Sequence, residues 1–213
     1  MVLIDMAAQV SREVRVITLD TGRLPEATYG MMESVRSRYG VTVEAVLPDR
    51  SELEQMIGRF GPNLFVQDVS LRRLCCEIRK VRPLDRKLQE LRAWATGLRR
   101  EQSETRGEVA RLEENGDHLK LNPLVDWTAE DVEEYTVRHD VHRHPLYSKG
   151  YTSIGCEPCT RATQPGEHER AGRWWWEQDT QKECGLHFTA DGKVERTLDV
   201  LLREITNSNT HGS

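Results

Sequence analysis

The placement of five cysteines is the feature of this sequence that most constrains its fold. Cys75 and Cys76 are adjacent, Cys156 and Cys159 form a Cys-x-x-Cys pair, and Cys184 stands alone. Four thiolates in two pairs can hold a tetrahedral zinc ion or an iron–sulfur cluster. The surrounding residues 145–188 are rich in Gly, Pro and aromatic residues and lack helical periodicity. We therefore expect them to fold around something other than a large apolar core.

The spacing of the first pair favours a cluster over zinc. Zinc sites usually separate paired cysteines by two to four residues. Adjacent side chains on a helix point about 100° apart, so Cys75 and Cys76 suit different irons of a bulky cluster. Zinc stays open, as does a buried apolar role for one of them with Cys156 and Cys159 as a redox dithiol. Lys80 lies one helical turn after Cys76, where its charge would offset that of a cluster.

Cys184 has the neighbours of a nucleophilic thiol. His187 follows it by three residues, and Arg170 and Arg173 precede it. Cations and a histidine lower a thiol pKa and favour the reactive thiolate. A capping or merely exposed role for His187 is the alternative.

Composition excludes several classes of function. The formal net charge of -5 does not favour non-specific binding to nucleic acid. No apolar run approaches the roughly 18 residues that a membrane span needs. The N-terminus shows no basic region followed by an apolar stretch, so we expect no signal peptide and a cytoplasmic location.

The first fifty residues predict an α/β fold. Residues 14–19 form a β-branched run that ends in Asp20-Thr21-Gly22, residues 25–38 have helical periodicity, and residues 41–47 form a second strand. Strand, helix, strand order is typical of a parallel doubly wound sheet, whose ligands bind at the strand ends.

The remaining elements are less regular. We expect a helix capped by Ser51, a helical stretch over 71–91 that Pro83 breaks in two, and a strand over 92–98 followed by a polar loop. A short strand over 118–121 precedes a capping box at Thr128 that opens a helix to Arg138. These patterns predict an α/β domain over residues 1–150 and a C-terminal segment over residues 151–213.

Six motifs, taken together, resemble the assimilatory adenylyl-sulfate (APS) reductases of bacteria and plants, and the match spans nearly all of residues 1–188. In chain order the motifs are Leu19-Asp-Thr-Gly22, Cys75-Cys76, Asn122-Pro-Leu-Val-Asp-Trp127, His144-Pro-Leu-Tyr-Ser-Lys-Gly-Tyr151, Ser153-Ile-Gly-Cys156-Glu-Pro-Cys159-Thr and Glu183-Cys-Gly-Leu-His187.

The resemblance implies an adenine nucleotide alpha-hydrolase-like fold and assigns roles to these residues. It implies that Cys75, Cys76, Cys156 and Cys159 bind a 4Fe-4S cluster, with Lys80 beside it. It makes Cys184 the nucleophile, assisted by His187, and gives the phosphosulfate to Arg170 and Arg173. The turn Leu19, Asp20, Thr21 and Gly22 corresponds to the one beside the adenosine, and Arg99 and Arg100 are weaker candidates for the substrate site.

The implied reaction is the reduction of APS to sulfite and AMP through a cysteine S-sulfonate, with thioredoxin as electron donor, in the sulfate assimilation that leads to cysteine. The related PAPS reductases generally lack both cysteine pairs, which favours APS here. PAPS reduction, or a non-catalytic zinc- or cluster-stabilised nucleotide-binding module, is the alternative. We expect no nucleic acid or membrane partner, and self-association into a homo-oligomer is left open.

The start of the chain departs from the family pattern. That pattern begins with a strand and a Ser-Gly-rich phosphate loop, whose N–H groups cradle an anion. Residues 1–7 correspond instead to the helix that follows this loop. We therefore expect a fragment or a mis-assigned start, in which one edge of the sheet is left bare.

Overall fold

A computed structural model describes residues 1–11, 13–102, 107–177 and 202. The chain divides into two compact units whose segments interleave along the sequence. The first unit comprises Met1–Thr18, Arg23–Ala45 and Leu88–Trp175, and the second comprises Leu19–Gly22, Val46–Lys87 and the described residues from Trp176 on. Because segments of both units alternate along the chain, they do not test the predicted division at residue 150, which stays a prediction. Among the described residues, no helix combines the length and apolar character that crossing a membrane requires.

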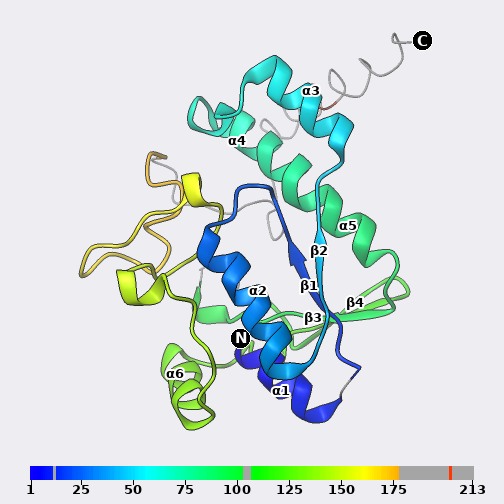
Figure 1. The fold of residues 1–213 in the computed structure, drawn as a ribbon, viewed down its shortest axis with the longest axis vertical. Helices are drawn as coiled ribbons and strands as arrows, with labels where there is room; N and C mark the ends of the chain where they lie inside the picture. Colours follow the sequence, from blue (N-terminus) through cyan, green and yellow to red (C-terminus); the bar gives the residue numbers. More distant parts are fainter. Residues whose placement is uncertain (12, 103–106, 178–201, 203–213) are drawn as a thin grey trace. The chain divides into compact units, whose positions relative to one another are not determined.

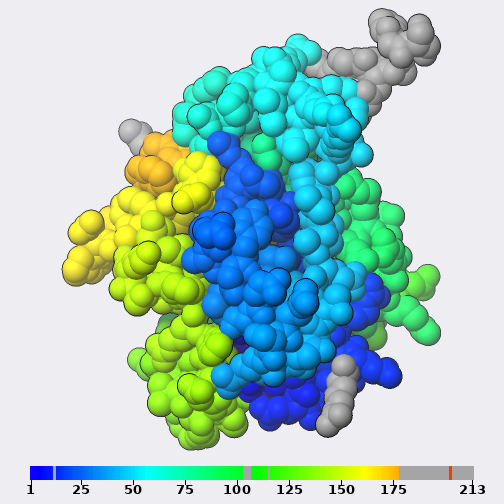
Figure 2. Space-filling view, viewed as in Figure 1, coloured from blue at the N-terminus to red at the C-terminus, as the bar shows by residue number. Residues whose placement is uncertain are grey.

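Strand, helix, strand order is confirmed at the start of the fold. Strands β1 (Val16–Leu19) and β2 (Val43–Val46) form a two-stranded sheet, joined by helix α2 (Glu26–Tyr39) (Figure 1). The pairing is parallel, because Val16 N donates to Thr42 O and Asp20 N donates to Val46 O, in step along both strands. Helix α2 ends at Gly40, whose φ of 65° is left-handed and suits glycine. In Figure 2 the side chains of α2, in blue, form part of the molecular surface that faces the viewer.

A second sheet has the order β3-β5-β4, from strands β3 (Ala93–Ala95), β4 (Leu112–Asn115) and β5 (His118–Leu121). Strand β5 runs parallel to β3 and antiparallel to β4. The α/β class and its parallel pairing are thus confirmed, but the polar loop expected before residue 118 was wrong in part, because it contains β4. Within the described residues β1 pairs only with β2, and β3 only with β5.

Two further helices of the first unit begin where the sequence predicts. Helix α1 spans Val2–Val10, and helix α6 spans Ala129–Arg138. At the start of α6 the side chain of Thr128 accepts from Asp131 N, and the carboxylate of Asp131 accepts from Thr128 N. This capping box satisfies two of the N–H groups that a helix start leaves without a partner.

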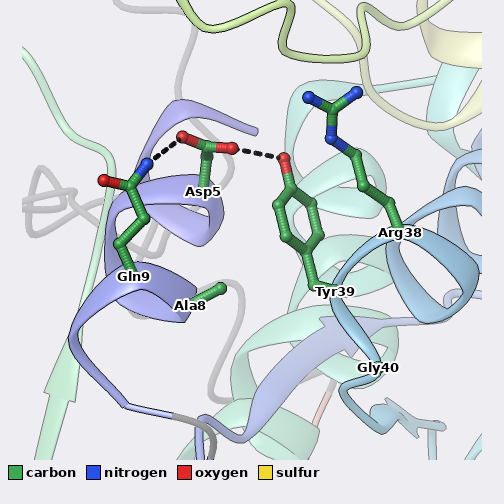
Figure 3. Close-up of a pocket in the computed structure, with 6 residues that line it drawn as sticks. All are labelled: Asp5, Ala8, Gln9, Arg38, Tyr39 and Gly40. Carbon is green, nitrogen blue, oxygen red and sulfur yellow. Dashed lines mark hydrogen bonds between the residues drawn. The ribbon is translucent and has the colours of Figure 1, made fainter.

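The buried carboxylate of Asp5 joins α1 to α2 and α6. It accepts hydrogen bonds from Gln9 Nε2 at 2.8 Å, Tyr39 OH at 2.9 Å and Tyr135 OH at 2.8 Å. Asp5 lies in a hollow of about 510 Å³ (Figure 3). The residues that line the hollow are Asp5, Ala8, Gln9, Arg38, Tyr39 and Gly40. Burial and the hydrogen bond to Asp5 raise the pKa of Tyr39 to about 12.

Helices form most of the second unit. In chain order they are α3 (Arg50–Phe60), the 3-10 turn Leu64–Val66, α4 (Val69–Cys76), the π turn Glu77–Val81 and α5 (Arg82–Leu88). The N-cap of α3 is Asp49, whose carboxylate accepts from Glu52 N at 3.0 Å, so the expected cap at Ser51 was wrong by two residues. Met56, Leu64, Leu74 and Ile78 are fully buried and form the core of this unit. Short 3-10 turns of the first unit lie at Arg100–Gln102, Tyr147–Lys149 and Glu157–Cys159.

The sequence predicts that Pro83 breaks this helical stretch in two, and that prediction was wrong. Pro83 is instead the second residue of α5, directly after the π turn. In that turn Arg82 N donates to Glu77 O, five residues back. The wider turn moves backbone carbonyls away from the proline ring, so the chain stays helical across it. Turns of this kind are frequent at functional sites.

Candidate functional site

The first cysteine pair ends α4. Cys75 and Cys76 are the last two residues of that helix, and both are buried and form no disulfide. The π turn begins at the next residue. Two buried thiols therefore lie at a point where the helical geometry changes.

A fully buried arginine lies one turn before this pair. The guanidinium of Arg72 forms a bidentate ion pair with Glu177, with Nε and Nη2 at 2.8 and 3.0 Å from the two carboxylate oxygens. Burial opposes the charge of Arg72, but the hydrogen bonds to Glu177 and the charge of Cys76 outweigh burial and raise its pKa. Arg72 and Glu177 were not predicted as site residues. The available signal was that Arg72 precedes Cys76 by four residues on one helix.

The π turn places a second buried arginine against the predicted adenosine turn. Nη1 of Arg79 donates to the carbonyl of Thr21 at 2.5 Å, and both residues are buried. Within the described residues, Nε of Arg79 has no hydrogen-bond partner. Lys80 follows on the same turn and is half-buried. The one-turn relation expected between Cys76 and Lys80 assumed an α-helix, whereas a π turn carries Lys80 here.

The predicted turn after β1 forms. Leu19 is the last residue of the strand, and the carboxylate of Asp20 accepts from Gly22 N at 2.8 Å. Gly22 has a φ of 69°, a left-handed conformation that favours glycine. Nη1 of Arg79 would lie 3.6 Å from a Cβ at Gly22, an ordinary contact distance. The structure thus brings this turn and the π turn after Cys76 together inside the second unit.

The second cysteine pair lies in the first unit, at the two ends of one 3-10 turn. Cys159 N donates to Cys156 O at 3.0 Å, and the hydroxyl of Thr160 donates to the same carbonyl at 2.8 Å. Both thiols are buried, and neither forms a disulfide. The turn therefore holds two thiols close in sequence and sheltered from water.

Arg173 packs against the loop before this pair. Thr160 and Arg173 form an antiparallel bridge, and Trp174 N donates to Cys159 O at 3.1 Å. The guanidinium of Arg173 lies over the Trp174 ring, 4.7 Å from its centroid, and Nη1 is 3.4 Å from Ile154 O. Arg173 is buried, and its Nε has no partner among the described residues. A cation is thus held beside the loop that leads to Cys156.

Trp174 has a strained backbone. It is fully buried, with a φ of 43°. A bulky residue rarely adopts a positive φ, and such strain costs on the order of 1–3 kcal/mol. Strained residues cluster at functional sites, which is consistent with the position of Trp174 between Arg173 and the second cysteine pair.

The other predicted arginines differ in their surroundings. Arg170 is half-buried, and its N donates to Nδ1 of His168 at 3.2 Å. Arg99 is buried and pairs with Glu101 at 3.3 Å and Glu169 at 3.8 Å. Arg100 pairs with Asp126 and donates to Val109 O, which ties it to the backbone before β4.

Each unit therefore contains one cysteine pair and a buried arginine near it. In the part of the chain that the structure describes, no group of three or more Cys, His, Asp or Glu side chains is placed to hold a metal ion. Cys184 and His187, the predicted nucleophile and its partner, lie outside the described residues.

The sequence is similar to named enzymes over most of its length. An adenosine 5'-phosphosulfate reductase of Burkholderia cepacia is 49% identical over 178 residues, which cover 83% of this chain and 71% of that protein. The enzyme of the same name from Pseudomonas aeruginosa is 47% identical over 194 residues, which cover 87% of this chain and 72% of that protein.

The fold has solved counterparts. The phosphoadenylyl-sulfate (PAPS) reductase of Candida auris, in a phosphate complex, matches with a TM-score of 0.59 and 26% identity. The match covers 74% of this chain and 75% of that one. An FMN adenylyltransferase of Candida glabrata matches with a TM-score of 0.50 at 14% identity, which shows a shared fold alone. The phosphoadenosine phosphosulfate reductase domain matches residues 1–162 of this chain, which therefore belongs to that family.

Proposed function

We propose that this chain reduces adenosine 5'-phosphosulfate to sulfite and AMP, in the cytoplasmic sulfate assimilation that leads to cysteine. The observation that carries the proposal is the identity of 49% and 47% to enzymes of that name, over more than two thirds of their length. The two cysteine pairs, which are buried and form no disulfides, support the same assignment.

We propose that Cys75, Cys76, Cys156 and Cys159 together bind a 4Fe-4S cluster. Four cysteine thiolates are the usual donor set of such a cluster, and these four thiols are buried and form no disulfides. Buried guanidinium groups near each pair, Arg72 and Arg173, offset the negative charge that four thiolates bring. The chemistry of this donor set supports the proposed cluster. When bound, the cluster supplies structural and electrostatic support rather than electrons, because two-electron thiol chemistry needs no redox metal.

The substrate's anionic group is assigned to arginines near the second cysteine pair. Arg173 is buried with an N–H free of partners among the described residues, so it retains a donor for an oxyanion. Arg170 is the second candidate, since its carbonyl accepts from Arg173 N at 2.9 Å. Arginine binds phosphate and sulfate groups through a planar fork of donors. Two such cations neutralise a phosphosulfate that would otherwise repel an approaching thiolate.

The adenosine is assigned to the turn Leu19, Asp20, Thr21 and Gly22. Lys80 is assigned a different role, as a cation beside the cluster ligands Cys75 and Cys76. This turn follows a parallel strand, where ligands of α/β sheets bind. Residues 1–150 then form the nucleotide-binding domain, which contributes Cys75 and Cys76. Residues 151–213 form the segment that contributes Cys156, Cys159 and Cys184.

The proposed chemistry is a thiol transfer in two steps. The thiolate of Cys184 attacks the sulfur of the substrate, the bond from that sulfur to the bridging oxygen breaks, and AMP leaves with the electron pair. His187 assists as a hydrogen-bond donor or by favouring the thiolate. A thiolate of thioredoxin, or of a similar dithiol carrier, then attacks the Cys184 sulfur and releases sulfite. The second thiol of the carrier resolves the mixed disulfide, so the two electrons come from the carrier.

The test compares substrates and donors on anaerobically purified protein. We expect stoichiometric iron and sulfide, and sulfite release from APS in preference to PAPS when thioredoxin is present. C184S should release no sulfite but keep the visible absorbance of the cluster, since Cys184 is not a ligand. Zinc without iron would contradict the cluster, preference for PAPS would contradict the substrate, and repeated turnover without a dithiol would contradict the donor.

A further inference from the structure

The buried pair of Arg72 and Glu177 has no assigned role in the chemistry above. We infer that Arg72 is a positioning residue for the first cysteine pair: held by Glu177, its guanidinium donates an N–H to the sulfur of Cys76 and so governs how firmly a cluster is retained there. This inference rests on the proposed 4Fe-4S site.

The geometry of the pair fixes the direction of the guanidinium. Arg72 and Glu177 are 1% and 4% exposed in their side chains, and they come from segments 105 residues apart in sequence. Two parallel N–H···O bonds, at 2.8 and 3.0 Å, occupy Nε and Nη2 of Arg72. A bidentate contact of this kind fixes orientation as well as distance. The donors on Nη1 are left for a neighbour other than Glu177.

Cys76 also contacts the Arg72 side chain. It lies four residues after Arg72 on α4, and its side chain is a hydrogen-bond partner of the Arg72 side chain. A thiolate that ligates iron retains the capacity to accept N–H donors, and such donors tune a cluster and hold its ligand in place. Lysine could keep the charge at position 72 but could not hold Glu177 and Cys76 with one rigid fork.

Stability alone gives a weak reason for this pair. Taking two charges out of water costs several kcal/mol per ion, and replacing a buried ion pair by apolar side chains of similar size is often neutral or stabilising. Removing a single partner, by contrast, leaves a buried charge uncompensated and is strongly destabilising. The apolar double variant R72M/E177L therefore separates a role in folding from a role at Cys76.

The experiment measures cluster retention in the holoprotein. Wild type, R72M/E177L, R72K and the control R50Q are purified anaerobically, and we follow iron content and the rate at which a chelator removes iron. Arg50 is an exposed α3 residue of the same unit that pairs with Glu54, also four residues away. We expect R72M/E177L to keep the wild-type melting temperature of the iron-free protein or exceed it, yet lose iron about 10-fold faster or more. R72K should fall between, and R50Q should match wild type.

Each outcome has one meaning. Wild-type protein without iron would overturn the proposed cluster itself. Iron in the wild type, with equal retention in R72M/E177L, would overturn the role of Arg72 and leave the proposed function intact. A loss of iron that only follows a lower melting temperature would also overturn it, since that pattern is structural. If R72M/E177L does not fold, R72K decides: faster iron loss at unchanged melting temperature supports the role, and unchanged retention overturns it.

Discussion

Gly155 leaves the space that the guanidinium of Arg173 occupies. A Cβ at position 155 would lie closer to Nη2 and Cζ of Arg173 than real Cβ atoms lie to their neighbours. Gly155 directly precedes Cys156, and Arg173 is the buried cation assigned to the substrate. The absence of a side chain at position 155 therefore leaves room for the side chain proposed to bind the substrate.

The first prediction concerns this contact. G155A should displace Arg173 and lower sulfite production about 100-fold, because a shift of about 1 Å in a positioning contact has effects of that size. G30A is the control, since a Cβ at Gly30 meets nothing within 4 Å, and alanine stabilises a helix interior by about 1 kcal/mol. Steady-state assays of both variants check the prediction. Equal activity of G155A and wild type would show that Arg173 tolerates displacement.

The second prediction concerns the carboxylate of Asp5. D5A leaves the hydroxyls of Tyr39 and Tyr135 without their acceptor, so the free energy of unfolding should fall by on the order of 2 kcal/mol or more. The pKa of Tyr39, about 12 in the folded chain, should fall as well. Denaturant unfolding and ultraviolet titration measure the two effects. D140N, at an exposed carboxylate, should change the free energy by less than about 0.5 kcal/mol.

The third prediction is a pH dependence of stability. Burial lowers the pKa of His144 below 6.5. Its Nδ1 accepts from Leu146 N at 3.2 Å, which requires an unprotonated Nδ1, and Nε2 lies 3.0 Å from the hydroxyl of Thr28. As the pH falls below about 6.5, the unfolded chain binds a proton that the folded chain does not, so stability falls. Above that pH the contribution is fully present.

H144N keeps an acceptor for Leu146 N and does not titrate. Its unfolding free energy should therefore change less than that of wild type between pH 7.5 and 5.5, and the two proteins should differ least in slope above pH 7. Denaturant unfolding at each pH gives the comparison. Identical slopes below pH 6.5 would mean that another group carries the dependence.

Local patterns were sufficient to predict the elements that depend on local chemistry. Helix α6 begins at its capping box, and α2 ends at a glycine with left-handed φ. Strand β4 was missed because Leu112–Asn115 is polar and short of β-branched residues. Its strand conformation comes from pairing with β5, including a contact from Lys120 to Glu113 at 3.1 Å. The effect of Pro83 was mispredicted because a π turn is not visible in a propensity pattern.

The candidate site, like the fold, could be predicted from the sequence only where local motifs determine it. The turn at Asp20 follows from a short motif that the sequence displays. The pairing of Arg72 with Glu177 joins positions 105 residues apart, and the fit of Arg173 against Gly155 depends on tertiary packing. Such relations need coordinates, because no local spacing encodes them.

The central claim is that Cys184 carries the sulfonate during turnover. The most direct measurement mixes the purified protein with APS in the absence of any dithiol and maps the modified peptide by mass spectrometry. The account predicts one S-sulfonate on the peptide that contains Cys184, its loss with release of sulfite on adding thioredoxin, and no adduct in C184S. An adduct on Cys156 or Cys159, or none on a protein that forms AMP from APS, would contradict it.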